Sequence, residues 1–197
     1  MRVVTSEEVR ASFARNADFR CDGKDVYYTD STARCIQIEY PPGEGQLVYL
    51  ARLVAALGYE ERYFRGATLW ITLWGVWDSR VEAVAFKAVE RFRAGYGEAR
   101  SLEVAPGHFF RDDEFVDAVA LLVQPMIVGW DAYYVPQWAY GGVDYFVHVS
   151  HDSYLTVVTR TEERYKETLE TLKSFKWATV REIQRERFCR SSETKPQ

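Results

Sequence analysis

The chain has 197 residues, of which 47% are apolar and 27% are charged, and its formal net charge is −4. This length suits one domain with a sizeable core, and the acidic balance argues against a general nucleic-acid binder, which needs a basic surface. The longest apolar run, 118–130, is too short to span a bilayer. The first residues also lack the apolar stretch of a signal peptide. We therefore expect a cytoplasmic protein that does not associate with membranes.

A capping box and two periodic patterns predict the secondary structure of the first third of the chain. Thr5 and Glu8 form a capping box that opens a helix to about residue 15. Alternating residues predict strands over 26–29 and 33–40 that pair with each other. A helix is expected over 46–57, where leucine and valine recur at helical spacing.

Residues 67–80 read A-T-L-W-I-T-L-W-G-V-W-D-S-R and predict a buried strand followed by a helix. Period-2 alternation places Leu69, Ile71 and Leu73 on one face and Trp70, Thr72 and Trp74 on the other. Both faces are apolar, which favours an interior strand. The tryptophans also fit a helical stripe, but Gly75 and a capping box from Ser79 to Glu82 favour a helix that begins only at residue 79.

The second half continues the alternation of helices and strands. Asp112 is expected to cap a helix that Pro125 ends or kinks. Residues 130–142 predict a short strand followed by an aromatic loop, and two further strands flank Asp152 before a last helix. The pattern predicts one α+β domain over 1–190, with a mixed or antiparallel sheet and helices packed on it, and a frayed tail over 191–197.

Four polar residues are candidates for catalysis. His151 and Asp152 follow an expected strand and could form an acid–base pair or half of a metal site. The alternative is a structural turn in which Asp152 caps its own backbone. His108 after a Pro-Gly turn and Asp131 after Gly-Trp could complete a divalent-metal hydrolase site, although no pair has chelating spacing.

Other features of the sequence argue against a cofactor or a bound metal. No nucleophile elbow and no phosphate loop are present, so no cofactor is expected. Cys21, Cys35 and Cys189 show no zinc-ligand spacing, so no metal site is expected and reduced thiols are the simplest interpretation. A bridge between Cys21 and Cys35 is the alternative.

The aromatic residues are candidates for binding. A platform for a partner could be formed by Trp130, Tyr133, Tyr134, Trp138 and Tyr140. If buried, the same rings are packing residues, and the sequence leaves both interpretations open. Trp70 and Trp74 could line a pocket for a small molecule.

Four short motifs, L-W-I-T-L-W-G-V-W (69–77), A-P-G-H (105–108), G-W-D (129–131) and V-S-H-D (149–152), resemble a group of small bacterial proteins without an assigned activity. The resemblance covers 67–155. It implies that four features belong together: the strand expected within 67–74, here called the tryptophan strand, His108, Asp131 and the turn at 151–152. It supplies no catalytic residue. The group has an acidic residue where this chain has Leu73 and a proline where it has Asp78, so a site that uses that acid is absent here.

The absence of enzyme signatures, the acidic balance and the aromatic excess together predict a non-enzymatic binding protein. It would act as an accessory, immunity-type or regulatory protein on a protein partner, through an aromatic-rich acidic surface. The alternative is a hydrolase built around His151 and Asp152. The oligomeric state is left open.

Overall fold

A computed structural model describes residues 1–15, 19–29, 33–39, 63–74, 79–139, 144–174, 179–183 and 188. The helix expected over 46–57 and the tail over 191–197 lie outside these residues. So do the side chains of the expected capping box at Ser79 and Glu82, although a helix does begin at Ser79.

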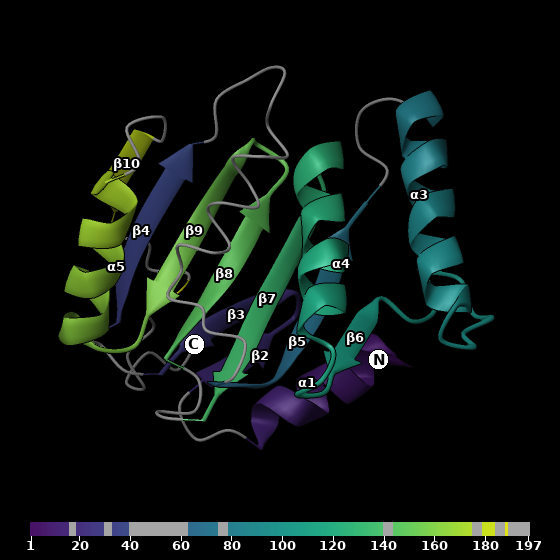
Figure 1. The fold of residues 1–197 in the computed structure, drawn as a ribbon, viewed down its shortest axis with the longest axis horizontal. Helices are drawn as coiled ribbons and strands as arrows, with labels where there is room; N and C mark the ends of the chain where they lie inside the picture. The colour runs from purple at the N-terminus through teal and green to yellow at the C-terminus, as the bar shows by residue number, and fades with distance from the viewer. Residues whose placement is uncertain are drawn as a thin grey trace, which may run out of the picture.

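Eight of the described strands form one antiparallel sheet (Figure 1). They are β1 (Arg2–Val4), β4 (Arg34–Glu39), β5 (Phe64–Leu73), β6 (Gly107–Phe110), β7 (Asp131–Trp138), β8 (Tyr145–Ser150), β9 (Tyr154–Thr159) and β10 (Thr179–Ile183). Their order is β1-β6-β5-β7-β8-β9-β4-β10. The described helices are α1 (Ser6–Ala14), α3 (Ser79–Ala94), α4 (Phe115–Val128) and α5 (Glu162–Ser174). The α+β class predicted from the sequence is confirmed.

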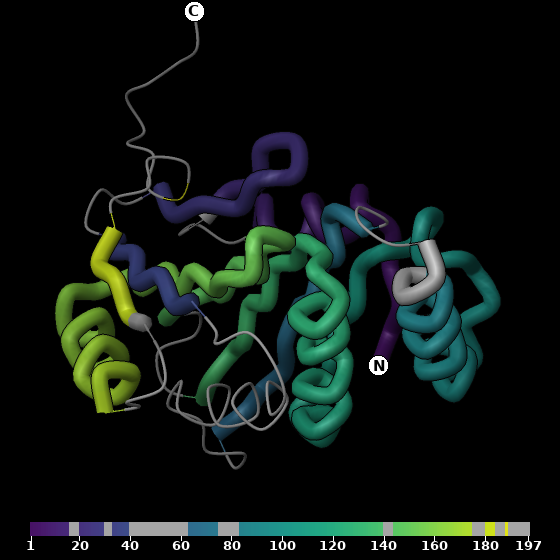
Figure 2. Tube along the Cα trace, turned by 90° about the horizontal axis from the view of Figure 1, so that it is seen from above, coloured from purple at the N-terminus to yellow at the C-terminus, as the bar shows by residue number. Residues whose placement is uncertain are grey.

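Two layers cover the two faces of the sheet (Figure 2). The helices α3, α4 and α5 lie on one face, where they bury a core that includes Leu69, Leu121 and Val147. On the other face lie α1 and a separate hairpin of β2 (Phe19–Asp22) and β3 (Asp25–Tyr28). They bury a second core that includes Trp70 and Phe146. Apolar residues on both faces of the strands are what this arrangement requires.

The tryptophan strand is the interior strand that the sequence predicted, since β5 lies between β6 and β7. Leu69 and Ile71 face the core under the helices, and Trp70 faces the opposite core. A register shift between Ile71 and Leu73 then interrupts the alternation. A bulge of this kind re-aims the side chains that follow it, and Trp74 packs against the helix-side core. Trp70 and Trp74 therefore belong to different cores, and the pocket expected between them is wrong.

The start of the chain confirms one prediction and corrects another. The capping box of α1 is present, because the Glu8 N–H donates to Thr5 Oγ1 at 3.3 Å and the Thr5 N–H donates to Glu8 Oε2 at 2.8 Å. The strand predicted over 26–29, however, pairs with β2 and not with β4. Strand β4 instead joins the main sheet between β9 and β10. The short turn after Asp22 explains this, since it favours a local hairpin.

Helix α4 also departs from expectation. Glu114, and not Asp112, occupies its N-cap position, and it makes no side-chain capping bond. Pro125 does not end the helix, which continues to Val128 and stops at Gly129 with φ of 68°. A left-handed glycine is the usual stop signal. Within the described part of the chain, no helix combines the length and the apolar character needed to cross a membrane.

Candidate functional site

Three of the four catalytic candidates meet where β7 begins and β8 ends. Asp131 is the first residue of β7, and His151 and Asp152 follow the last residue of β8. Because β7 and β8 are antiparallel neighbours, the start of one lies beside the end of the other. The sequence could suggest that these residues belong together, but only strand pairing brings them into contact.

The geometry of this cluster is specific. Asp131 Oδ1 accepts the backbone N–H of His151 at 2.7 Å and lies 2.8 Å from His151 Nδ1. Asp152 Oδ1 lies 3.6 Å from Nε2 of the same ring. A carboxylate on Nδ1 places the proton there in the neutral ring and leaves Nε2 as the basic nitrogen. Chemically, such a pair can accept a proton or orient a ligand.

The same contacts also build the turn that joins β8 to β9. The Asp152 N–H donates to Ser150 Oγ at 3.2 Å, and the Ser153 N–H donates to the Ser150 carbonyl at 3.2 Å. Ser153 has φ of 63°, a left-handed conformation that is typical of tight turns. Asp131 ties this turn to β7, so a structural role accounts for both contacts of its carboxylate with His151.

His108 does not join this cluster, and its predicted role there is wrong. It lies on β6 opposite Leu69, whereas Asp131 lies on β7 opposite Leu73. Four residues along β5 and two strand spacings separate them, which is about 16 Å by strand geometry. His108 also shares the face of Leu69, under the helices, whereas alternation along β7 places Asp131 on the face of Tyr133.

His108 is instead part of a buried basic pair. Both His108 and Arg93 are 0% exposed. Burial, and then the positive charge of Arg93, lower the pKa of His108 to about 3, so the ring is neutral. Arg93 Nη2 donates to the carbonyls of Ala105 at 2.9 Å and Ser101 at 3.4 Å, which fastens the loop before β6 to α3. An arginine is usually exposed, so nothing in the sequence indicated this pair.

Metal-ligating side chains do not gather in the described part of the chain. No group of three or more His, Cys, Asp or Glu residues is arranged there to hold a metal ion. No disulfide joins Cys21 to Cys35, so the bridge considered as an alternative is not formed. Burial raises the pKa of the Cys21 thiol to about 11, which keeps it protonated at neutral pH.

Most of the aromatic candidates are buried. Trp70, Trp130, Tyr133 and Tyr134 are at most 3% exposed. The reason is that 131–138 forms one continuous interior strand and not a short strand with a loop. Trp138 is half-buried and packs its ring at 5.9 Å from Phe64. Tyr140 lies outside the described residues. The exposed platform is therefore wrong for three of its five rings, namely Trp130, Tyr133 and Tyr134.

The surface of α4 carries a feature that the sequence reading missed. Its outward side exposes apolar residues, with Val116 at 67% and Ile127 at 42%. The signal was present in the sequence, since residues 115–128 (F-V-D-A-V-A-L-L-V-Q-P-M-I-V) contain a single charged side chain, Asp117. A helix that is apolar all round is expected to be covered on all sides.

Comparisons with known proteins give no relative for this chain. It matches no family model, no curated protein and no solved structure. The resemblance of its four motifs stays a prediction, and any functional argument must be built on the residues themselves.

Proposed function

We propose that this protein works by binding another protein, as an accessory or regulatory component, through the outward face of α4. That face, the α4 outer stripe, consists of Val116, Ala120, Val123 and Ile127. Residues spaced by three, four, seven and eleven positions fall on one side of an α-helix. The four side chains therefore form one line along three turns.

The exposure of the α4 outer stripe carries the proposal. Val116 is 67% and Ile127 is 42% exposed, Ala120 is exposed, and Val123 is half-buried. The opposite side of the helix is in the core, where Ala118, Leu121 and Leu122 are buried. Contiguous apolar surface on a folded protein marks interaction sites. Covering one such side chain completely contributes about 1.5–3 kcal/mol.

Comparison with the neighbouring helices shows that an exposed apolar stripe without charged residues is particular to α4. Helix α5 packs on the same face of the sheet and exposes charged residues, namely Glu162, Glu163, Lys166, Glu167, Glu170 and Lys173. Helix α3 exposes Val84, but Lys87 and Arg91 are exposed beside it on the same helix. An ordinary surface helix keeps polar residues outward, as α5 does. The α4 outer stripe lacks charge, which favours a helix that is covered by a partner.

The aromatic surface expected from the sequence does not carry this function, because its described rings are mainly buried. The alternative is a hydrolase built around His151 and Asp152 with His108 or Asp131 nearby. Asp131 contacts His151, but strand geometry separates His108 from it. The backbone contacts around His151 hold the turn between β8 and β9 against the start of β7. A binding role is thus the better supported of the two.

The test is affinity capture from the native host, with the wild-type protein compared with Val116→Lys and Ile127→Lys. Val104→Lys is the matched control, because Val104 is also an exposed valine, at 59%, but lies in a turn away from α4. A partner that is retained by the wild type and by the control but lost by both α4 variants supports the proposal. A partner retained equally by all four proteins contradicts it.

A further inference from the structure

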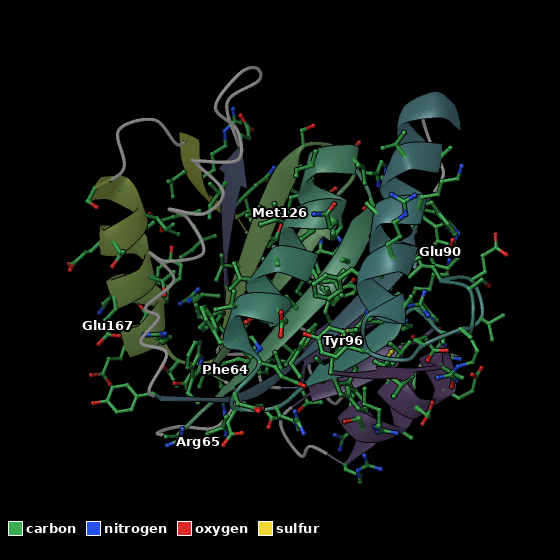
Figure 3. All side chains as sticks on the ribbon, turned by 45° about the vertical axis from the view of Figure 1, so that its right-hand side comes forward. Phe64, Arg65, Glu90, Tyr96, Met126 and Glu167 are labelled. Atoms are coloured by element: carbon green, nitrogen blue, oxygen red, sulfur yellow. The ribbon has the colours of Figure 1, made fainter. Side chains whose placement is uncertain are left out.

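The exposed surface of α4 continues onto its neighbour α3, because the two helices pack against each other on one face of the sheet (Figure 2). Tyr96 follows the end of α3 and lies on the side that faces α4 (Figure 3). Burial, and then the Asp117 carboxylate, raise the pKa of Tyr96 to about 12, so this ring lies beside the first turn of α4. In the first half of α3, the ring of Phe86 lies 5.9 Å from that of Trp130, which follows α4 in the chain. The two helices therefore run in opposite directions.

The exposed side of α3 combines apolar and basic residues. Positions spaced by three, four and seven fall on one side of a helix, and here they are Val84, Lys87, Ala88 and Arg91. All four are exposed, with Val84 at 71%, whereas Ala85 and Val89 on the other side of α3 are buried. Val84 and Ala88 add apolar surface beside the α4 outer stripe. Lys87 and Arg91 form a basic border to that surface.

The two cations of the basic border are not engaged within the protein. In the part of the chain that the structure describes, Lys87 and Arg91 form no ion pair. Lys166 on α5 differs, because its Nζ lies 3.8 Å from Oε1 of Glu162 on the same helix. Four positions separate Lys87 from Arg91, which is about 6 Å along a helix. Two carboxylates at the same spacing can therefore meet both charges without displacing an internal partner.

An amphipathic helix is the partner element that fits this surface. The α4 outer stripe runs from Val116 to Ile127, about 16 Å by the rise of an α-helix. A partner helix presents apolar residues at positions i, i+3, i+4 and i+7 to an apolar surface of this kind. Acidic residues four positions apart on its flank are about 6 Å apart, as are Lys87 and Arg91. The formal net charge of the whole chain is −4, which disfavours an anionic membrane. Attraction of an acidic flank therefore has to come from these local cations.

We propose that the protein partner presents an amphipathic helix with an acidic flank to α3 and α4. Its apolar side lies on the α4 outer stripe, and two of its carboxylates, four positions apart, pair with Lys87 and Arg91. The proposal rests on the protein-binding role of α4 and adds the chemistry of the partner.

The experiment measures the affinity of the full chain for three labelled helical peptides by fluorescence anisotropy. The peptides share one line of leucines at helical spacing and carry glutamate, glutamine or lysine at the flanking positions. The charge-reversed variant carries both Lys87→Glu and Arg91→Glu. Its matched control carries Lys166→Glu and Lys173→Glu, which change the net charge equally but lie on α5. Vesicles of phosphatidylglycerol test a membrane, and sedimentation of the chain alone tests a second copy.

We expect the wild type to bind the glutamate peptide about fivefold more tightly than the glutamine peptide, which is the gain from two exposed ion pairs. The lysine peptide should bind least. The charge-reversed variant should prefer the lysine peptide, whereas the α5 control should keep the wild-type order. Ile127→Lys should weaken the binding of all three peptides.

The proposal is overturned if no peptide binds, if charge reversal on α3 leaves the order unchanged, or if Ile127→Lys leaves every affinity unchanged. Binding of the vesicles alone, or self-association alone, would assign the surface to a membrane or to a second copy and would also overturn it. Capture from the native host separates this failure from that of the binding role itself. A captured partner that depends on Val116 and Ile127 but not on the charge of α3 would remove only the acidic helix, whereas failure of both capture and peptides would remove both proposals.

Discussion

Asp131 holds His151 at two points: one carboxylate oxygen accepts the His151 backbone N–H at 2.7 Å and lies 2.8 Å from its Nδ1. The side chain of Asp131 is 20% exposed, so water replaces these bonds poorly. This relationship joins the β8–β9 turn to the first residue of β7. It explains why two residues that are twenty positions apart in the chain act as one structural unit.

Replacing Asp131 with alanine should therefore destabilise the fold. Two donors of His151 would lose their acceptor, and we expect the free energy of unfolding to fall by about 1–3 kcal/mol. The control is Asp152→Ala, whose side chain is 60% exposed and which should change stability by about 0.5 kcal/mol or less. Urea unfolding followed by tryptophan fluorescence measures both. Equal effects of the two substitutions would show that Asp131 does not tie the turn.

His108 predicts a dependence of stability on pH. Burial and Arg93 lower its pKa from the ordinary value of 6.5 to about 3, so below pH 6.5 the unfolded chain binds a proton that the folded chain does not. Stability due to this group is complete above pH 6.5 and is lost as the pH falls toward 3, by about 1.4 kcal/mol per pH unit. The variant His108→Gln has no titrating ring. Between pH 6 and 4, its free energy of unfolding should therefore depend on pH less steeply than that of the wild type, by the amount that one bound proton contributes. Parallel slopes for the two proteins would contradict the assignment.

Gly107 on β6 lies against Val4 of β1 and Val9 of α1 and leaves no room for a side chain. A Cβ at this position would meet Val4 Cγ2 at 2.7 Å and would lie even closer to Val9 Cγ2. Both valines are buried in the second core, so neither can move aside freely. Gly107→Ala should destabilise the protein by about 1–3 kcal/mol through overpacking.

A suitable control for this substitution is Gly23→Asn. Gly23 has φ of 60° with open space around it, and asparagine tolerates this left-handed conformation. The control should unfold close to the wild-type temperature. A Gly107→Ala protein with the same thermal midpoint as this control would mean that α1 packs differently from the structure.

The sequence predicted the parts of the fold that depend on local signals. The capping box at Thr5 and Glu8, the interior strand around Leu69 and the α+β class all follow from spacing and alternation, which left a mixed or an antiparallel sheet open. The bulge before Leu73 was not predictable, because this strand carries apolar residues on both faces and a shift of one position leaves that pattern apolar. Trp74 was therefore assigned to the wrong face.

The site could be predicted only in part, for a similar reason. That Asp131 and His151 lie together depends on the pairing of β7 with β8, which is a non-local relationship. The burial of Trp130 and Tyr133 depends on a strand that carries proline near its end, where the sequence predicted only a short strand followed by a loop. Burial of Arg93 against His108 goes against the usual preference of arginine for the surface. Composition cannot indicate such an exception.

The most direct test of the proposed binding role is site-specific photo-crosslinking in cells of the native host. A photoreactive phenylalanine is placed at Val116 or Ile127 on the α4 outer stripe, or at Val104 as the exposed control, and the adducts are identified by mass spectrometry. We predict the same protein adduct from both α4 positions and none from Val104. If the α4 positions give no adduct, or if all three positions give the same one, the outward face of α4 is not the binding surface.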